Sequence, residues 1–95
     1  MKYVVKNTAI STFDNVNFPN EIRIYYLGRD DHPCIYPDSV IGWKRRSYAE
    51  KYKAGMIACD KAEWKNNPNR RYWANHYEIV EIEKDYQDFL DSFKD

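Results

Sequence analysis

Runs of apolar residues separated by turn-forming residues predict three or four short β-strands. Residues 2–7 contain the run Tyr-Val-Val, and residues 22–27 read Ile-Arg-Ile-Tyr-Tyr-Leu, the segment richest in β-branched and aromatic side chains. In residues 75–83 apolar side chains fall on both faces of a strand, and glutamates make its outer positions polar. A fourth strand over residues 34–36 would form a hairpin with the strand at 22–27, because Asp, Asp, His and Pro between them favour a turn.

A long helix is predicted over residues 47–65. The apolar residues there recur at helical spacing, at Ala49, Tyr52, Met56 and Cys59. Ser47-Tyr48-Ala49-Glu50 has the pattern of a capping box, in which the side chains of Ser47 and Glu50 each accept a backbone N–H at the helix start. Asn66-Asn67-Pro68 ends the helix, since proline cannot continue it.

Residues 84–95 carry a shorter helical pattern, with apolar side chains at positions i, i+3, i+4 and i+7: Tyr86, Phe89, Leu90 and Phe93. A chain of 95 residues has room for one hydrophobic core, so residues 1–95 are expected to form a single domain. The predicted fold class is α+β: a small antiparallel sheet of three to four strands packed against one long helix, with a short C-terminal helix.

Charge changes this picture by its distribution and not by its total, which is zero. Residues 43–73 carry about +6, because nine Lys and Arg residues there face three acids. Residues 78–95 carry about −5 by the same count. Despite 32% charged residues, the 17% aromatic content favours a folded chain, because disordered chains are poor in aromatics. A basic middle and an acidic end suit a chain that presents one of them to a partner.

The N-terminal apolar run is too short for a signal peptide, and no later run approaches the length of a membrane span. The expected location is therefore the cytoplasm. The chain has two cysteines, Cys34 and Cys59, whereas a small secreted domain usually has about four to eight. We expect both thiols to stay reduced, and a Cys34–Cys59 disulfide is the alternative.

Residues with catalytic or metal-binding chemistry are sparse. The four candidate ligands, His32, Cys34, Cys59 and His76, lack the paired short spacing of a zinc site. Cys34 and His32 are the one sequence-near nucleophile and base, in a stretch that is ordinary turn composition. The three glycines are isolated, so no glycine-rich phosphate loop exists. We expect no enzymatic activity and no cofactor.

Two segments carry a family resemblance: Arg46-Ser47-Tyr48-Ala49-Glu50-Lys51-Tyr52 and the closing Tyr77-Glu78-Ile79-Val80-Glu81-Ile82. Following a strand pair, they resemble small proteins of unknown function that bacteriophages and prophages encode. The resemblance covers about the last two thirds of the chain and assigns no functional residue. It implies a protein in the host cytoplasm that binds a host protein, including components of defence systems such as CRISPR effectors.

The side-chain inventory favours a binding protein, because Tyr, Trp and Arg dominate the energetics of protein interfaces and this chain is rich in all three. We predict a non-catalytic inhibitor or adaptor that contacts another protein. Its expected contact residues are Tyr25, Tyr26, Arg45, Arg46, Arg70, Arg71 and Trp73. The alternative is a nucleic-acid-binding protein, in which cations and aromatics of residues 43–73 contact phosphates and stack on bases. The acidic segment from Glu78 onward is a further option, as a mimic of nucleic-acid phosphates.

The ligand spacing predicts that the fold needs no structural metal. Adding EDTA should leave the thermal midpoint of unfolding unchanged, because metal-dependent small domains lose folding free energy when a chelator removes the ion. A midpoint that falls by several degrees with EDTA and recovers with zinc would show a metal site that the spacing conceals.

Overall fold

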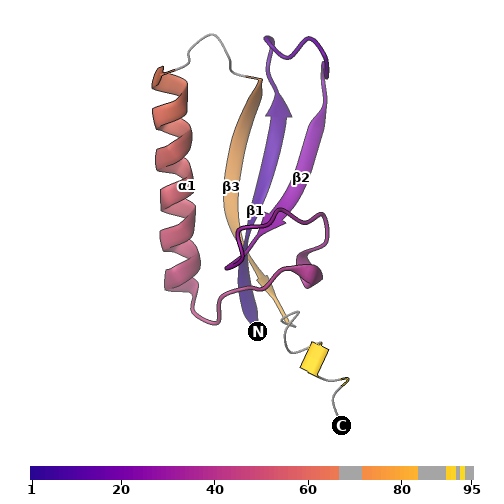
Figure 1. Cartoon of the computed structure of the whole chain (residues 1–95), viewed down its shortest axis with the longest axis vertical. Coiled ribbons are helices and arrows are strands. Elements are labelled where there is room, and N and C mark those ends of the chain that lie inside the picture. Colours follow the sequence, from indigo (N-terminus) through magenta and orange to yellow (C-terminus); the bar gives the residue numbers. More distant parts are fainter. Residues whose placement is uncertain (67–71, 84–89, 92, 94–95) are drawn as a thin grey trace.

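The computed structural model of the chain describes residues 1–66, 72–83, 90–91 and 93. Three strands form one antiparallel sheet: β1 (Lys2–Ser11), β2 (Ile22–Leu27) and β3 (Trp73–Ile82). The strand order is β2-β1-β3. A short 3-10 helix, η1 (Pro37–Ser39), and one long helix, α1 (Arg46–Asn66), lie between β2 and β3 in the chain, and α1 runs along β3 (Figure 1). The predicted α+β architecture of an antiparallel sheet and one long helix is confirmed.

Two predicted elements are missing from the described residues. Residues 34–36 contribute one isolated bridge, Cys34 to Tyr26, in place of a fourth strand. The chain bends at Ile35 and enters η1 at Pro37, so the pairing does not continue toward Ile24. The short C-terminal helix predicted over 84–95 is not seen either, and most of that segment lies outside the described residues.

The side of the sheet that faces α1, here called the inner face, holds the hydrophobic core. Val5 pairs with Leu27 on β2, and the next inner position, Asn7, pairs with Tyr25 and Tyr77. Val5, Leu27 and Tyr77 are buried, and the residues that pack around them come from α1, β2 and the segment before α1: Tyr52, Met56, Ile57, Tyr25 and Trp43. The apolar side of α1 therefore packs against the inner face.

The opposite side, the outer face, is closed only where β1 begins. Lys2 and Val4 are fully buried there, and so is Val40 from the segment that follows η1. The Lys2 ammonium donates hydrogen bonds to the backbone oxygens of Val40 and, at 3.3 Å, of Asp38. Gly42 allows the segment that follows η1 to lie this close to the start of β1, because a Cβ at this position would be only 2.8 Å from the Tyr3 carbonyl oxygen. The segment before α1 thus covers one half of the outer face.

Helix α1 begins at Arg46, one residue before the predicted start. Ser47 therefore lies inside the first turn and not at the N-cap, so the predicted capping box of Ser47 and Glu50 is wrong. The Glu50 carboxylate accepts a hydrogen bond from Arg46 Nε at 3.1 Å, one helical turn away. Ala49 is the one buried residue of α1, and the rest of its contact side is half-buried.

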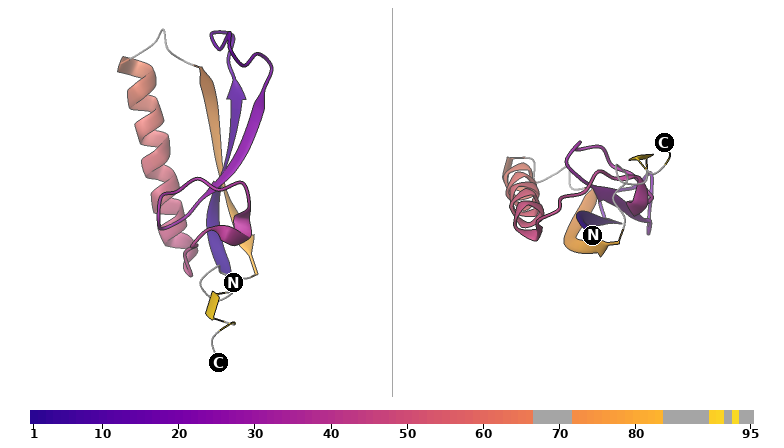
Figure 2. Two further views of the ribbon diagram at one scale, coloured as in Figure 1. Left: turned by 45° about the vertical axis from the view of Figure 1, so that its right-hand side comes forward. Right: turned by 90° about the horizontal axis from the view of Figure 1, so that it is seen from below.

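No described helix combines the length and apolar character needed to cross a bilayer. Figure 2 shows that α1 stands on one side of the sheet only.

Asn7 lies fully buried at the centre of β1, and its amide joins all three strands. Its Nδ2 donates to the Tyr25 hydroxyl at 2.6 Å and to Asn75 Oδ1 at 3.0 Å, while its Oδ1 accepts the His76 backbone N–H at 3.2 Å. A buried amide is stable only when its donors and acceptors are satisfied, and here the neighbouring strands supply the partners.

Replacing Asn7 by alanine should lower the free energy of unfolding by about 2 kcal/mol, because the Tyr25, Asn75 and His76 groups lose a buried partner. Urea denaturation measures the change. The exposed Asn17→Ala in the β1–β2 connection is the matched control and should change stability by less than about 0.5 kcal/mol. Equal stabilities for the two variants would contradict a structural role for Asn7.

Candidate functional site

The outer face is open at the end of the sheet where β1 ends and β2 and β3 begin, here called the hairpin end. Ile10 pairs with Ile22 on β2 and with Ala74 on β3, and Ile24 lies two residues beyond Ile22 on the same face. The exposed fractions of Ile10, Ile22 and Ile24 are 46%, 62% and 45%. These three side chains, the isoleucine patch, form a continuous apolar surface that nothing in the described part of the chain covers.

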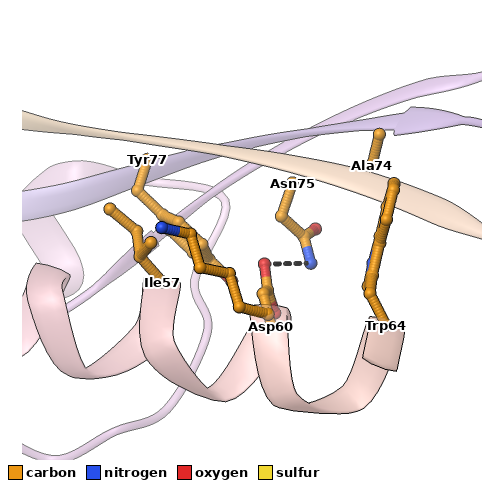
Figure 3. Close-up of a pocket in the computed structure, with 7 residues that line it drawn as sticks. Ile57, Asp60, Trp64, Ala74, Asn75 and Tyr77 are labelled. Atoms are coloured by element: carbon orange, nitrogen blue, oxygen red, sulfur yellow. Dashed lines mark hydrogen bonds between the residues drawn. The ribbon is translucent and has the colours of Figure 1, made fainter. Parts of the chain in front are cut away.

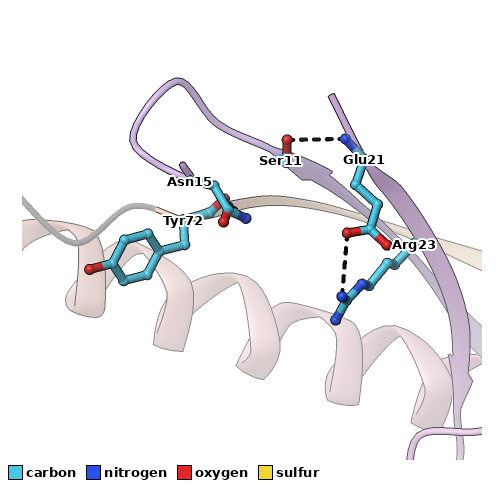
Figure 4. Close-up of polar contacts among 5 residues, drawn as sticks. All are labelled: Ser11, Asn15, Glu21, Arg23 and Tyr72. Atoms are coloured by element: carbon cyan, nitrogen blue, oxygen red, sulfur yellow. Dashed lines mark hydrogen bonds and ion pairs between the residues drawn. The ribbon is translucent and has the colours of Figure 1, made fainter. Parts of the chain in front are cut away.

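The connection between β1 and β2 adds two apolar side chains to the hairpin end. Phe13 is completely exposed and Val16 is 80% exposed. The connection is nevertheless fixed, because the buried Asn15, which lies against Tyr72 (Figure 4), donates from Nδ2 to the Tyr72 carbonyl oxygen at 3.0 Å. The Thr12 N–H donates to the same oxygen at 3.0 Å. These bonds draw the connection toward the β3 side of the sheet, so Phe13 and Val16 are held on an ordered turn.

On the inner face of the hairpin end, the Arg23 guanidinium packs over two neighbouring aromatic rings, whose centres lie 6.3 Å apart. Its guanidinium carbon lies 4.7 Å from the ring centre of Phe18 and 4.6 Å from that of Trp73. The Glu21 carboxylate holds the same guanidinium at 3.3 Å (Figure 4). Cation–π contacts of this kind position a long, exposed side chain, so Arg23, Phe18 and Trp73 form a cluster at the hairpin end, on the face of the sheet opposite to the isoleucine patch.

A hollow of about 340 Å³ lies between the C-terminal half of α1 and β3 (Figure 3). Trp64 and Ala74 form one wall, and the Asp60 carboxylate at the base accepts a hydrogen bond from Asn75 Nδ2 at 3.1 Å. A second hollow of about 280 Å³ shares Asn75 and continues toward Arg23 and Tyr25. Asp60, Asn75 and Tyr25 are joined by hydrogen bonds through the buried Asn7, which suits a structural network better than a reaction centre.

The predicted contact residues do not gather at one place. Arg45 and Arg46 are exposed and lie two and three residues after Trp43, which pairs with Tyr3 at the start of β1. Trp73 pairs with Ser11 at the other end of β1, about 25 Å away at the rise of a strand. Arg70 and Arg71 lie outside the described residues.

The two predicted tyrosines lie on opposite faces of β2, and both are half-buried. The Tyr25 hydroxyl is bonded to Asn7 on the inner face. Tyr26 lies opposite Lys6, and its backbone pairs with Cys34 at the outer edge of β2.

Sequence reasoning missed the isoleucine patch and Arg23. The signal was present in the alternation Ile22-Arg23-Ile24, since residues two apart on a strand share a face. Which of the two faces would stay uncovered depends on where α1 and the segment before it pack, and the alternation does not contain that information.

Metal and thiol chemistry have no assembled site in the part of the chain that the structure describes. Among those residues, no three or more His, Cys, Asp and Glu side chains are grouped as metal ligands. Cys34 is half-buried and Cys59 is exposed, and both are free thiols. No known protein family, characterised protein or solved structure matches the chain.

Two tyrosines between the sheet and α1, Tyr77 on β3 and Tyr52 on α1, are held in their neutral form. Burial raises the pKa of Tyr77 well above its usual value, and the negative charge of Asp60, which accepts a hydrogen bond from the Tyr77 hydroxyl, raises it further. Burial and a hydrogen bond to Asp31 raise the pKa of Tyr52 in the same way. A folded-state pKa above the unfolded one gives a stabilisation that is complete below about pH 10 and is lost as the pH rises beyond it.

The free energy of unfolding should therefore fall as the pH rises above about 10, and Tyr77→Phe should make that fall less steep. Urea denaturation at a series of alkaline pH values gives the slope. Tyr36→Phe, at an exposed ring, controls for introducing a phenylalanine. A Tyr77→Phe slope equal to that of the parent would show that Tyr77 does not contribute to the alkaline loss.

Proposed function

We propose that the chain is a non-catalytic binding protein and that its hairpin end contacts another protein. The observation that carries this proposal is the isoleucine patch, three β-branched apolar side chains that remain exposed in a domain with a small core. Large apolar groups grouped on one surface are disfavoured in water and are typical of interaction sites.

The surroundings of the patch support the same assignment. Phe13 and Val16 add exposed apolar side chains on an ordered turn at the same end of the sheet, and Trp73 and Arg23 lie at this end on the inner face. Aromatic residues and arginine are the side chains that most often anchor protein interfaces. Because Asn15 fixes the turn before any partner arrives, little ordering entropy would be lost on binding.

The partner class to test first is a host protein, as the resemblance to phage and prophage proteins implies, with the chain acting as an inhibitor or adaptor. Nucleic-acid binding is supported less well. The cations of α1 share the helix with Glu50, Asp60 and Glu63, and Arg46 is already paired with Glu50. A nucleic-acid ligand prefers an unopposed basic surface.

The test compares two double variants at opposite ends of the molecule. Ile10→Lys with Ile22→Glu places charge in the patch at side chains that are already exposed, and the two charges are opposite in sign across the strand pair, so the fold should persist. Arg45→Glu with Arg46→Glu is the matched control at the start of α1. Proteins captured from a bacterial lysate by the parent are identified, purified and titrated against all three forms.

Loss of affinity by at least about tenfold in the isoleucine variant alone, with unchanged circular dichroism, is the expected result. Equal affinity of the parent and the isoleucine variant would rule out the hairpin end as the contact. Loss in the arginine variant alone would move the site to the start of α1. Binding of a mixed-sequence oligonucleotide that weakens steeply with salt would instead indicate a nucleic-acid ligand.

A further inference from the structure

β2 is an edge strand, and its backbone groups alternate between β1 and the open side. The Tyr26 N–H and C=O point to the open side, because they exchange hydrogen bonds with Cys34 at 2.7 and 2.9 Å. The Glu21 carbonyl points the other way and accepts the Ser11 N–H at 2.9 Å. The even-numbered residues Ile22 and Ile24 therefore direct their backbone N–H and C=O groups to the open side.

Nothing in the described part of the chain meets these groups. The pairing of Cys34 with Tyr26 is an isolated bridge, because the chain bends at Ile35 and enters η1 at Pro37 instead of continuing beside Ile24. The β1–β2 connection does not cover the edge either, since Asn15 and Thr12 tie it to Tyr72 on the β3 side of the sheet. Natural edge strands are usually blunted by such a cover or by an outward charge, whereas the Arg23 side chain is held on the inner face by Phe18 and Trp73.

We propose that β2 receives an extended segment of the partner protein, which adds a fourth strand to the sheet by pairing with Ile22 and Ile24. This inference rests on the proposed function and specifies the partner's conformation. Every second side chain of the added strand would lie beside the isoleucine patch and is therefore expected to be apolar. Main-chain hydrogen bonds supply affinity in this binding mode, and alternate side chains supply specificity.

A second copy of the chain fits this edge poorly. If Ile22 paired with Ile24 of the copy, Arg23 would face Arg23 across the two-fold axis, and like charges directly opposite are destabilising. If Ile22 paired with Ile22 of the copy, Ile24 would face Asn20, whose φ of 59° takes the backbone out of the extended conformation. A foreign strand meets neither restriction.

The test exploits the direction of the Ile24 N–H. Ile24→Pro removes the outward donor and leaves the hydrogen bonds between β2 and β1 in place, since proline is tolerated on the open side of an edge strand. Ile24→Ala is the matched control, because it shortens the apolar side chain and keeps the N–H. A displayed library of random linear peptides is selected on the parent protein, and the enriched peptides are synthesised and titrated against the parent and both variants.

Strand addition predicts enriched peptides with alternating apolar residues whose affinity falls about tenfold or more with Ile24→Pro and less than about threefold with Ile24→Ala. Hydrogen exchange gives an independent readout: the Ile22 and Ile24 amides should exchange readily in the free protein and become protected when peptide binds. Circular dichroism of Ile24→Pro confirms that the sheet is retained.

Three outcomes would overturn the inference. Equal losses with Ile24→Pro and Ile24→Ala would show that peptides use the apolar patch alone, which leaves the proposed function standing. If no peptide is enriched, or if the enriched peptides bind Ile24→Pro as well as the parent, strand addition is ruled out. This conclusion is independent of the separate test of Ile10 and Ile22 against a captured partner protein. A concentration-dependent dimer that Ile24→Pro abolishes would assign the edge to a second copy.

Discussion

The antiparallel pairing of β1 with β3 over ten residues, from Lys2 with Ile82 to Ser11 with Trp73, is the constraint on which the rest of the structure depends. It joins the first and last strands, so β2 must take the remaining side of β1 and β1 becomes central. It also sets the register that brings Asn7, Tyr25 and Tyr77 side by side. A slip of one residue would exchange the two faces and place Lys6 and Thr8 under α1.

One helix can cover one face of a small sheet, and this limit explains where the chain is exposed. α1 closes the inner face, while the buried Lys2 and Val40 join the segment before α1 to the N-terminal half of the outer face. The chain has no further described element to place over the hairpin half. The Lys6–Glu78 ion pair at 3.4 Å lies between the two halves, with the isoleucine patch beyond it. The proposed binding surface is thus the area that the fold itself leaves uncovered.

The tyrosines gain a role that their number alone does not reveal. The hydroxyls of Tyr25, Tyr52 and Tyr77 are bonded to Asn7, Asp31 and Asp60, so their rings fill the space between α1 and the sheet while their polar ends keep hydrogen-bond partners. Asp31, which has a φ of 57°, is held by Tyr52 and ties the turn after β2 to the helix. A core built in this way is polar at its centre, in keeping with a mean hydropathy of −0.88 in a folded chain.

The sequence by itself determined the elements whose signals are local. β-Branched and aromatic residues marked β2, helical spacing with a closing Asn-Asn-Pro marked α1, and an α+β sheet-and-helix fold followed from their order. Local signals misplaced the partner of Glu50, which bonds Arg46 and not Ser47, because several groups near a helix start compete for one carboxylate.

Only the tertiary structure decided which residues meet. Arg45 and Trp73 belong to one basic segment in the sequence and lie at opposite ends of β1 in space, because α1 runs the length of the sheet between them. The exposure of Ile10, Ile22 and Ile24, and the open backbone edge beside them, depend on long-range packing that leaves one half of the outer face without a cover. An alternating pattern says which residues share a face of a strand, but the buried face is chosen by whatever packs against it.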